Sequence, residues 1–141
     1  MVADLQSGST DSSGGVTVSE AQDHALFSLQ RIIDCVIRDG SRLLVYLEGQ
    51  GVFATDAPDN GLYLPNDQAF AKELGCACYC SAPHPSYVEG MLGELQRIEV
   101  SADGQAAMQG DPLACRRVVE AVGYLQATIK VALINGDLIL A

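Results

Sequence analysis

A run of five consecutive apolar residues, Leu43-Leu44-Val45-Tyr46-Leu47, constrains the fold more than any other feature of this sequence. The run has the length of a β-strand, and both faces of such a strand would be apolar. That pattern is typical of a strand buried on both sides in a parallel sheet. Helical patterns lie on both sides of the run, so the order of elements predicts an α/β protein.

Apolar residues at helical spacing predict several helices. The first would run from Ser19, which with Gln22 fits a capping box, to Asp39. The other three predicted helices are a short one capped by Asn66 and ended by Gly75, one from about Ser86 to Leu95, and one that begins at Asp111-Pro112.

Further strands are predicted over Cys76–Cys80 and, more weakly, over Ile98–Ser101. Near the end of the chain, Asn135-Gly136 lies between two apolar segments, 131–134 and 137–140. Asn-Gly in this setting indicates a tight β-hairpin, because both turn residues tolerate positive φ. The fold expected from these elements is a single-domain, three-layer α/β/α arrangement with a mostly parallel sheet and a C-terminal antiparallel hairpin. It would occupy residues 19–141, and residues 1–18 would form a flexible polar tail.

The length and net charge of the chain limit the functions that it can have. The chain has 141 residues, and 8 basic against 18 acidic residues give a net charge of −10. A surface of that sign repels nucleic acid and anionic membranes, so neither is an expected partner. No apolar run reaches the ~20 residues of a membrane span, and the N-terminus lacks the pattern of a secretory signal. These features predict a cytoplasmic protein whose five cysteines are reduced thiols.

The segment 75–87, GCACYCSAPHPSY, is the most informative about chemistry. In a strand, the side chains of Cys76, Cys78 and Cys80 would share one face. They could be packing residues, since free cysteine is often buried, or soft-metal ligands together with His84. Cys80 would end its strand just before a helix N-terminus, where a thiol pKa is lowered, and His84 could add positive charge or move a proton.

No cofactor or metal is predicted. The turn Gly49-Gln50-Gly51 has some features of a phosphate-binding loop, but it lacks the third glycine and the helix that should follow. It is therefore a weak nucleotide signal.

Two segments resemble the DsrE-like sulfur-relay family, which includes TusD-type sulfurtransferases. The first is 43–53, LLVYLEGQGVF, similar to a hydrophobic family strand followed by a glycine-containing turn. The second is 77–82, ACYCSA, similar to the strand that ends in the sulfur-accepting cysteine. The resemblance implies that Cys80 accepts sulfur, that the protein forms homo- or hetero-oligomers, and that its partners are sulfur donor and acceptor proteins.

Two functional hypotheses follow. In the first, the protein is a cytoplasmic sulfur carrier or sulfurtransferase subunit: Cys80 carries persulfide sulfur, His84 assists, and Cys76 and Cys78 are auxiliary thiols. In the second, it is a noncatalytic α/β binding or assembly module whose cysteines are packing residues. Only the first predicts one thiol of unusually high reactivity at neutral pH.

Overall fold

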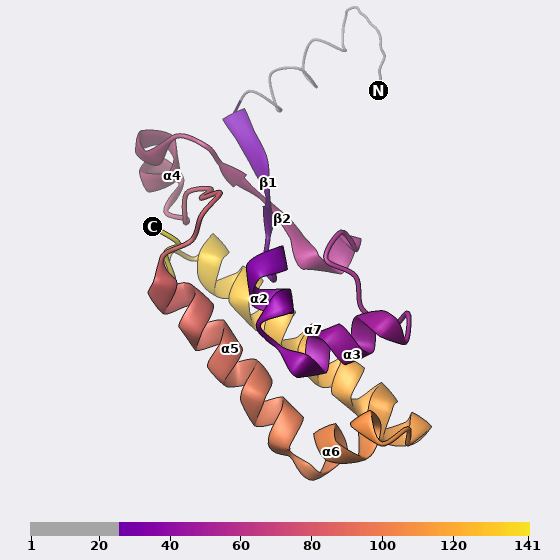
Figure 1. The fold of residues 1–141 in the computed structure, drawn as a ribbon. Helices are drawn as coiled ribbons and strands as arrows, with labels where there is room; N and C mark the ends of the chain where they lie inside the picture. Colours follow the sequence, from indigo (N-terminus) through magenta and orange to yellow (C-terminus); the bar gives the residue numbers. More distant parts are fainter. Residues whose placement is uncertain (1–25) are drawn as a thin grey trace, which may run out of the picture.

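The computed structural model describes residues 26–141. Its elements, in chain order, are two strands, one 3₁₀ turn and six helices: β1 (Phe27–Arg31), α2 (Cys35–Asp39), α3 (Arg42–Gly49), η1 (Pro58–Asn60), β2 (Gly61–Pro65), α4 (Gln68–Leu74), α5 (Pro85–Val100), α6 (Ala102–Met108) and α7 (Pro112–Ile134). Figure 1 shows the two long helices, α5 and α7, running antiparallel, with α6 joining them at one end. Helices α2 and α3 lie across them, while the strands and α4 gather at the other end.

The predicted α/β/α fold is wrong. Within residues 26–141 the only sheet has two strands, β1 and β2, and they pair antiparallel. The core consists instead of helix faces packed against one another, and buried residues from α2, α3, α5, α6 and α7 form one continuous cluster. The described chain is therefore a helical domain with a β-ribbon at one end.

The apolar run that led to the α/β prediction belongs to helix α3. Leu43, Leu44 and Leu47 are buried, while Val45 is exposed, which is a helical pattern. Ser41 caps the helix, because its hydroxyl accepts a 3.2 Å hydrogen bond from the backbone N–H of Leu44. A run of five apolar residues cannot by itself distinguish a buried strand from one side of a short helix.

The helix predicted up to Asp39 is also wrong over most of its described part. Residues 27–31, FSLQR, alternate apolar and polar and form β1. Asp34 then caps the short helix α2, and its Oδ1 accepts a 2.9 Å hydrogen bond from Ile37. The proposed cap at Ser19 and Gln22, and the predicted polar tail at residues 1–18, lie outside the described residues.

The remaining predicted strands are absent from the structure. Residues 76–80 are irregular, and residues 98–100 are the last turn of α5. The C-terminal hairpin is wrong as well, because residues 131–134 end helix α7 and Asn135 is its C-cap. Conversely, β2 covers Gly61–Pro65, where no strand was predicted.

Three of the predicted helices are confirmed. Helix α4 ends at Gly75, whose φ of 74° is in the left-handed region that glycine favours, although its N-cap is Asp67 rather than Asn66. Helix α5 covers the predicted segment and continues to Val100. Helix α7 begins with Asp111 as N-cap and proline in the first turn.

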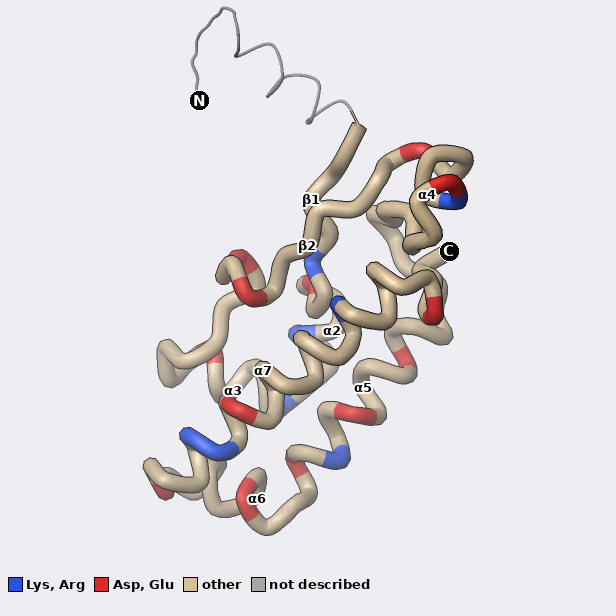
Figure 2. Tube along the Cα trace, turned by 180° about the vertical axis from the view of Figure 1, so that it is seen from behind, with Lys and Arg blue, Asp and Glu red and all other residues tan. Residues whose placement is uncertain are grey.

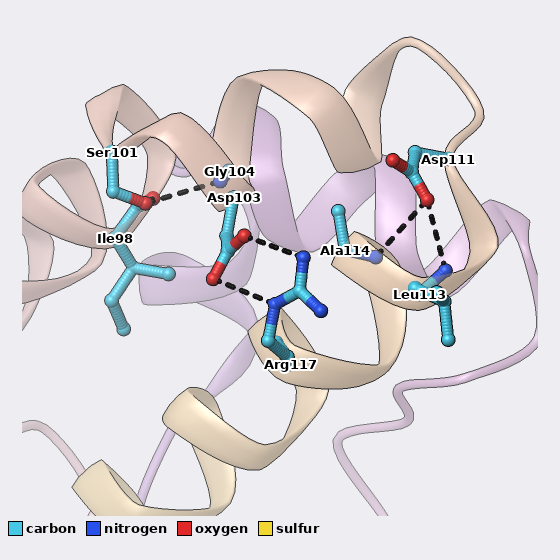
Figure 3. A network of polar contacts seen from close by, with 8 residues as sticks. All are labelled: Ile98, Ser101, Asp103, Gly104, Asp111, Leu113, Ala114 and Arg117. Carbon is cyan, nitrogen blue, oxygen red and sulfur yellow. Dashed lines mark hydrogen bonds and ion pairs between the residues drawn. The ribbon is translucent and has the colours of Figure 1, made fainter.

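Polar contacts join α6 to α7, as Figure 3 shows. The hydroxyl of Ser101 caps α6, and the Asp111 carboxylate accepts hydrogen bonds from the first turn of α7. Arg117 of α7 donates two hydrogen bonds, of 3.0 and 2.9 Å, to the two carboxylate oxygens of Asp103 on α6. This bidentate pair fixes the sharp return of the chain between α5 and α7.

Candidate functional site

The cysteine segment 76–80 is held by backbone hydrogen bonds to three separate parts of the fold. The N–H of Ala77 donates to Leu133 at the end of α7, and that of Tyr79 donates to Pro65 in β2. Gln30 of β1 binds the backbone of Cys80 twice, donating from Nε2 to the carbonyl (3.1 Å) and accepting from the N–H at Oε1 (2.9 Å). These bonds hold the segment in place although it belongs to no helix or strand.

The structure gives Cys80 and His84 no direct contact. The half-buried Cys80 thiol donates a 3.2 Å hydrogen bond to the carbonyl of Ala82. His84 is the N-cap of α5, and its Nδ1 accepts a 3.1 Å hydrogen bond from the N–H of Ser86. The same nitrogen lies 2.9 Å from the Ser86 hydroxyl, so Nδ1 is engaged within the first turn of α5.

Cys76 and Cys78 are also half-buried, and they line a cavity of about 270 Å³ next to the C-terminal residues 139–141. Burial raises the pKa of the Cys78 thiol, and the negative charge of Asp67 raises it further. Cys80 does not line this cavity, although Cys80 and Cys76 both lie near enough to Cys78 to contribute to its raised pKa. In the described part of the chain, no three His, Cys, Asp or Glu side chains could hold a metal ion together.

A second cavity, of about 310 Å³, lies between the end of α3, the loop that follows it with η1, and the middle of α7. We call it the α3–α7 cavity. Its walls are mostly aliphatic and aromatic, with Leu47, Val52, Phe53, Val119 and Val122 as the larger apolar side chains. Gly51, whose φ is 76°, and Gly123 contribute backbone to the walls, so the space is not filled by side chains there.

Asn60, which lies behind the cavity, is fully buried and all its amide hydrogen-bonding groups are used. Its Oδ1 accepts from the N–H of Ile33 (2.9 Å), and its Nδ2 donates to the carbonyls of Ile33 (2.8 Å) and Thr55 (2.7 Å). These backbone partners settle which side of the Asn60 amide is oxygen. Oδ1 also accepts a 3.0 Å hydrogen bond from Nε2 of Gln126 on α7.

That bond determines the orientation of Gln126, which lines the α3–α7 cavity and is only 7% exposed. If the Gln126 amide were flipped, two carbonyl oxygens would face each other, so Nε2 must point at Asn60. No residue of the described part of the chain donates a hydrogen bond to the Gln126 Oε1. A buried amide oxygen without a donor costs free energy, and a bound ligand or water that donates to it recovers that cost.

Asp59 in η1 also lines the cavity and is exposed, which places a negative charge where the cavity meets solvent. No lysine or arginine of the described chain is among the lining residues. The site therefore combines an apolar interior, one buried amide and one carboxylate. That composition suits binding of a small molecule better than catalysis, which calls for a nucleophile or a matched acid and base.

Sequence analysis did not predict this site. Two of its residues did carry signals: Gly51 is in the glycine turn after the apolar run, and Gly123 interrupts an otherwise regular helix. A glycine inside a helix is costly and often has a packing or functional reason. The pairing of Gln126 with Asn60 left no signal in the sequence.

Searches of protein-family models, curated proteins and solved structures find no match to this chain. Among the helices of residues 26–141, none has both the length and the apolar character that crossing a bilayer requires.

Proposed function

We propose that this protein is a noncatalytic binding module that takes a small ligand into the α3–α7 cavity. One observation carries the proposal: an apolar cavity of about 310 Å³ has the nearly buried Gln126 in its wall, and Oε1 of that side chain has no donor among residues 26–141. Ligand sites in proteins are typically concave and apolar with a few polar groups that fix orientation, and volumes of ~300 Å³ lie at the small end of their range.

The residues that line the cavity support binding rather than reaction. Within residues 26–141 they include no cysteine, histidine, serine or lysine, and Asp59 is the one ionisable side chain among them. A lone exposed carboxylate lacks the partner that general acid–base catalysis needs. The walls are also well anchored, because η1 is tied to α7 through Asn60 and Gln126.

The test uses benzyl alcohol as a neutral, compact probe, followed by two-dimensional amide NMR of the full chain. We expect saturable shifts that centre on Gly51, Val119 and Gly123. A Cβ added at Gly123 meets no atom within 4 Å, so Gly123→Leu folds with a side chain in the cavity and abolishes these shifts. Gly90→Leu, at an exposed and equally open position of α5, is the matched control and leaves them unchanged. Identical shifts in both variants, or none in the wild type, would refute the proposal.

Sulfur transfer through Cys80 is the second candidate. The observation that favours it is the double hydrogen bond from Gln30, which fixes the backbone of a half-buried, partly accessible cysteine just ahead of helix α5. The hydrogen bonds of the two side chains oppose it, because the Cys80 thiol donates to Ala82 and Nδ1 of His84 is engaged with Ser86, so neither is bonded to the other. A cytoplasmic location, an oligomeric state, and donor and acceptor proteins as partners remain predictions that belong with this candidate.

Intact mass after incubation with a persulfide donor tests sulfur transfer directly. Added sulfur on the wild type that is lost in Cys80→Ala and kept in Cys115→Ala supports the relay. Cys115 is a suitable control because it is half-buried on α7, away from the segment 76–80. Equal labelling of both variants would exclude Cys80 as the carrier.

A further inference from the structure

We propose that the ligand of the α3–α7 cavity is a small organic ammonium ion, with its apolar part inside the cavity and its N–H groups directed at Gln126 and Asp59. This inference rests on the binding function proposed above and adds the chemical class of the ligand.

The interior of the cavity selects for an apolar body. Leu47 and Val122 are 1% and 3% exposed, so the deep wall offers carbon atoms rather than hydrogen-bonding groups. Phe53 and Val119, both half-buried, continue this surface toward solvent. Burying an apolar group against such walls is favourable in proportion to the area it removes from water.

The side-chain atoms available for hydrogen bonds are mainly acceptors. Gln126 offers Oε1, and Asp59 offers two carboxylate oxygens. The side-chain donor among the described lining residues is the second N–H of the Gln126 amide, since the first is used by Asn60. A ligand rich in donors satisfies more of these atoms than one rich in acceptors, and an ammonium group carries donors alone.

The negative charge at the cavity also favours an ammonium ligand. Among the cavity-lining residues that the structure describes, no lysine or arginine offsets the carboxylate of Asp59, and the chain as a whole carries −10. Figure 2 shows acidic positions on most elements of the described chain and fewer basic ones. A cation is attracted to this site and an anion is repelled, most strongly at low ionic strength.

The experiment compares three probes that share one ring: benzylamine, benzyl alcohol and benzoate. Their affinities for the full chain are measured by the same NMR titration in low salt. We expect benzylamine to bind about tenfold more tightly than benzyl alcohol, because a hydrogen bond to a charged group is stronger than a neutral one. Benzoate should give no shifts at the cavity.

Two variants locate the source of this preference. Asp59→Asn should reduce the advantage of benzylamine over benzyl alcohol to about twofold or less, and Asp56→Asn, an exposed acidic neighbour outside the cavity, should leave it intact. Gln126→Met keeps the side-chain length and removes the amide, so it should weaken both donor probes.

The outcomes separate this inference from the function on which it rests. Equal binding of benzylamine and benzyl alcohol at the cavity, or an unchanged preference in Asp59→Asn, would overturn the ammonium class and leave the binding module standing. Absence of any localised shift with all three probes would overturn both.

Discussion

Gln126 of α7 and Asn60 of η1 form a side-chain hydrogen bond of 3.0 Å in the interior, although 66 residues separate them in the chain. The bond joins the loop region after α3 to the longest helix. It also turns the carbonyl oxygen of Gln126 away from Asn60, which leaves that oxygen for a ligand. One contact thus serves both the stability of the fold and the chemistry of the cavity.

Asn60 should be among the positions most sensitive to substitution. Asn60→Asp keeps the size of the side chain but replaces the amide that donates to the carbonyls of Ile33 and Thr55 with an oxygen that repels them. We expect a loss of about 3 kcal/mol or more in the free energy of unfolding, measured by urea denaturation. Asn135→Asp, at the exposed C-cap of α7, should cost no more than about 1 kcal/mol, because its new charge only opposes the helix dipole.

Alanine substitution at two helical glycines should change the stability of the protein in opposite directions. At Gly123 a Cβ has open space, so Gly123→Ala should stabilise the protein by about 0.5–1 kcal/mol through helix propensity. At Gly104 a Cβ would lie 2.1 Å from the carbonyl oxygen of Ile98, so Gly104→Ala should destabilise it by roughly 3 kcal/mol. Thermal unfolding of the two variants measures both effects, and destabilisation by Gly123→Ala would contradict an open cavity wall.

Tyr87 should make stability depend on pH in the alkaline range. Its buried hydroxyl donates a 2.7 Å hydrogen bond to the carbonyl of Ile32, and burial raises its pKa above the ordinary value of 10.0. The folded state therefore keeps this proton longer than the unfolded state. The stabilisation is complete below pH 10 and declines above it, by up to about 1.4 kcal/mol per pH unit.

Urea denaturation between pH 8 and pH 11 tests this dependence. Tyr87→Phe should cost about 1–2 kcal/mol at pH 8, because the carbonyl of Ile32 loses its partner. The difference between the two proteins should shrink above pH 10. A difference that stays constant to pH 11 would show that Tyr87 does not titrate as described.

The effect of Arg117 on the pKa of Asp103 should be measurable in a carboxyl titration. Hydrogen bonds from Arg117 lower the pKa of Asp103, with a further contribution from its positive charge. In Arg117→Gln, NMR should show the Asp103 carboxyl titrating at higher pH, while Arg116→Gln should not shift it. Any stability from the pair is present above the ordinary carboxyl pKa and is lost as pH falls through the lowered one.

The thiols should differ in their rates of alkylation. Cys78 is half-buried and its pKa is raised, so at pH 7.5 it should react with iodoacetamide several-fold more slowly than the exposed Cys35. Peptide mass spectrometry after short exposures measures each site. Faster labelling of Cys78 than of Cys35 would contradict its described surroundings.

The sequence predicted those elements whose end signals are local. Asp111-Pro112 at the start of α7 and Gly75 at the end of α4 act within one turn of backbone, so their meaning does not depend on the rest of the fold. The apolar run in α3 was ambiguous because its burial is decided by the helices packed against it. Ser41, whose hydroxyl accepts from the N–H of Leu44, is the helix N-cap that the strand prediction missed.

The candidate site could not be predicted from the sequence, for a similar reason. The cysteines drew attention because their chemistry is distinctive, yet Cys76–Cys80 follows a path set by hydrogen bonds to Pro65, Gln30 and Leu133. The α3–α7 cavity is defined by space between ordinary residues. Neither the approach of Gln126 to Asn60 nor the unpaired Oε1 has a pattern along the chain.

The most direct test of the binding function is a set of intermolecular NOE measurements between benzylamine and the methyl groups of the protein. A ligand in the α3–α7 cavity should give contacts from its ring protons to Leu47, Val119 and Val122, and Gly123→Leu should remove them. Contacts confined to other parts of the surface, or contacts that persist unchanged in Gly123→Leu, would contradict a binding site in this cavity.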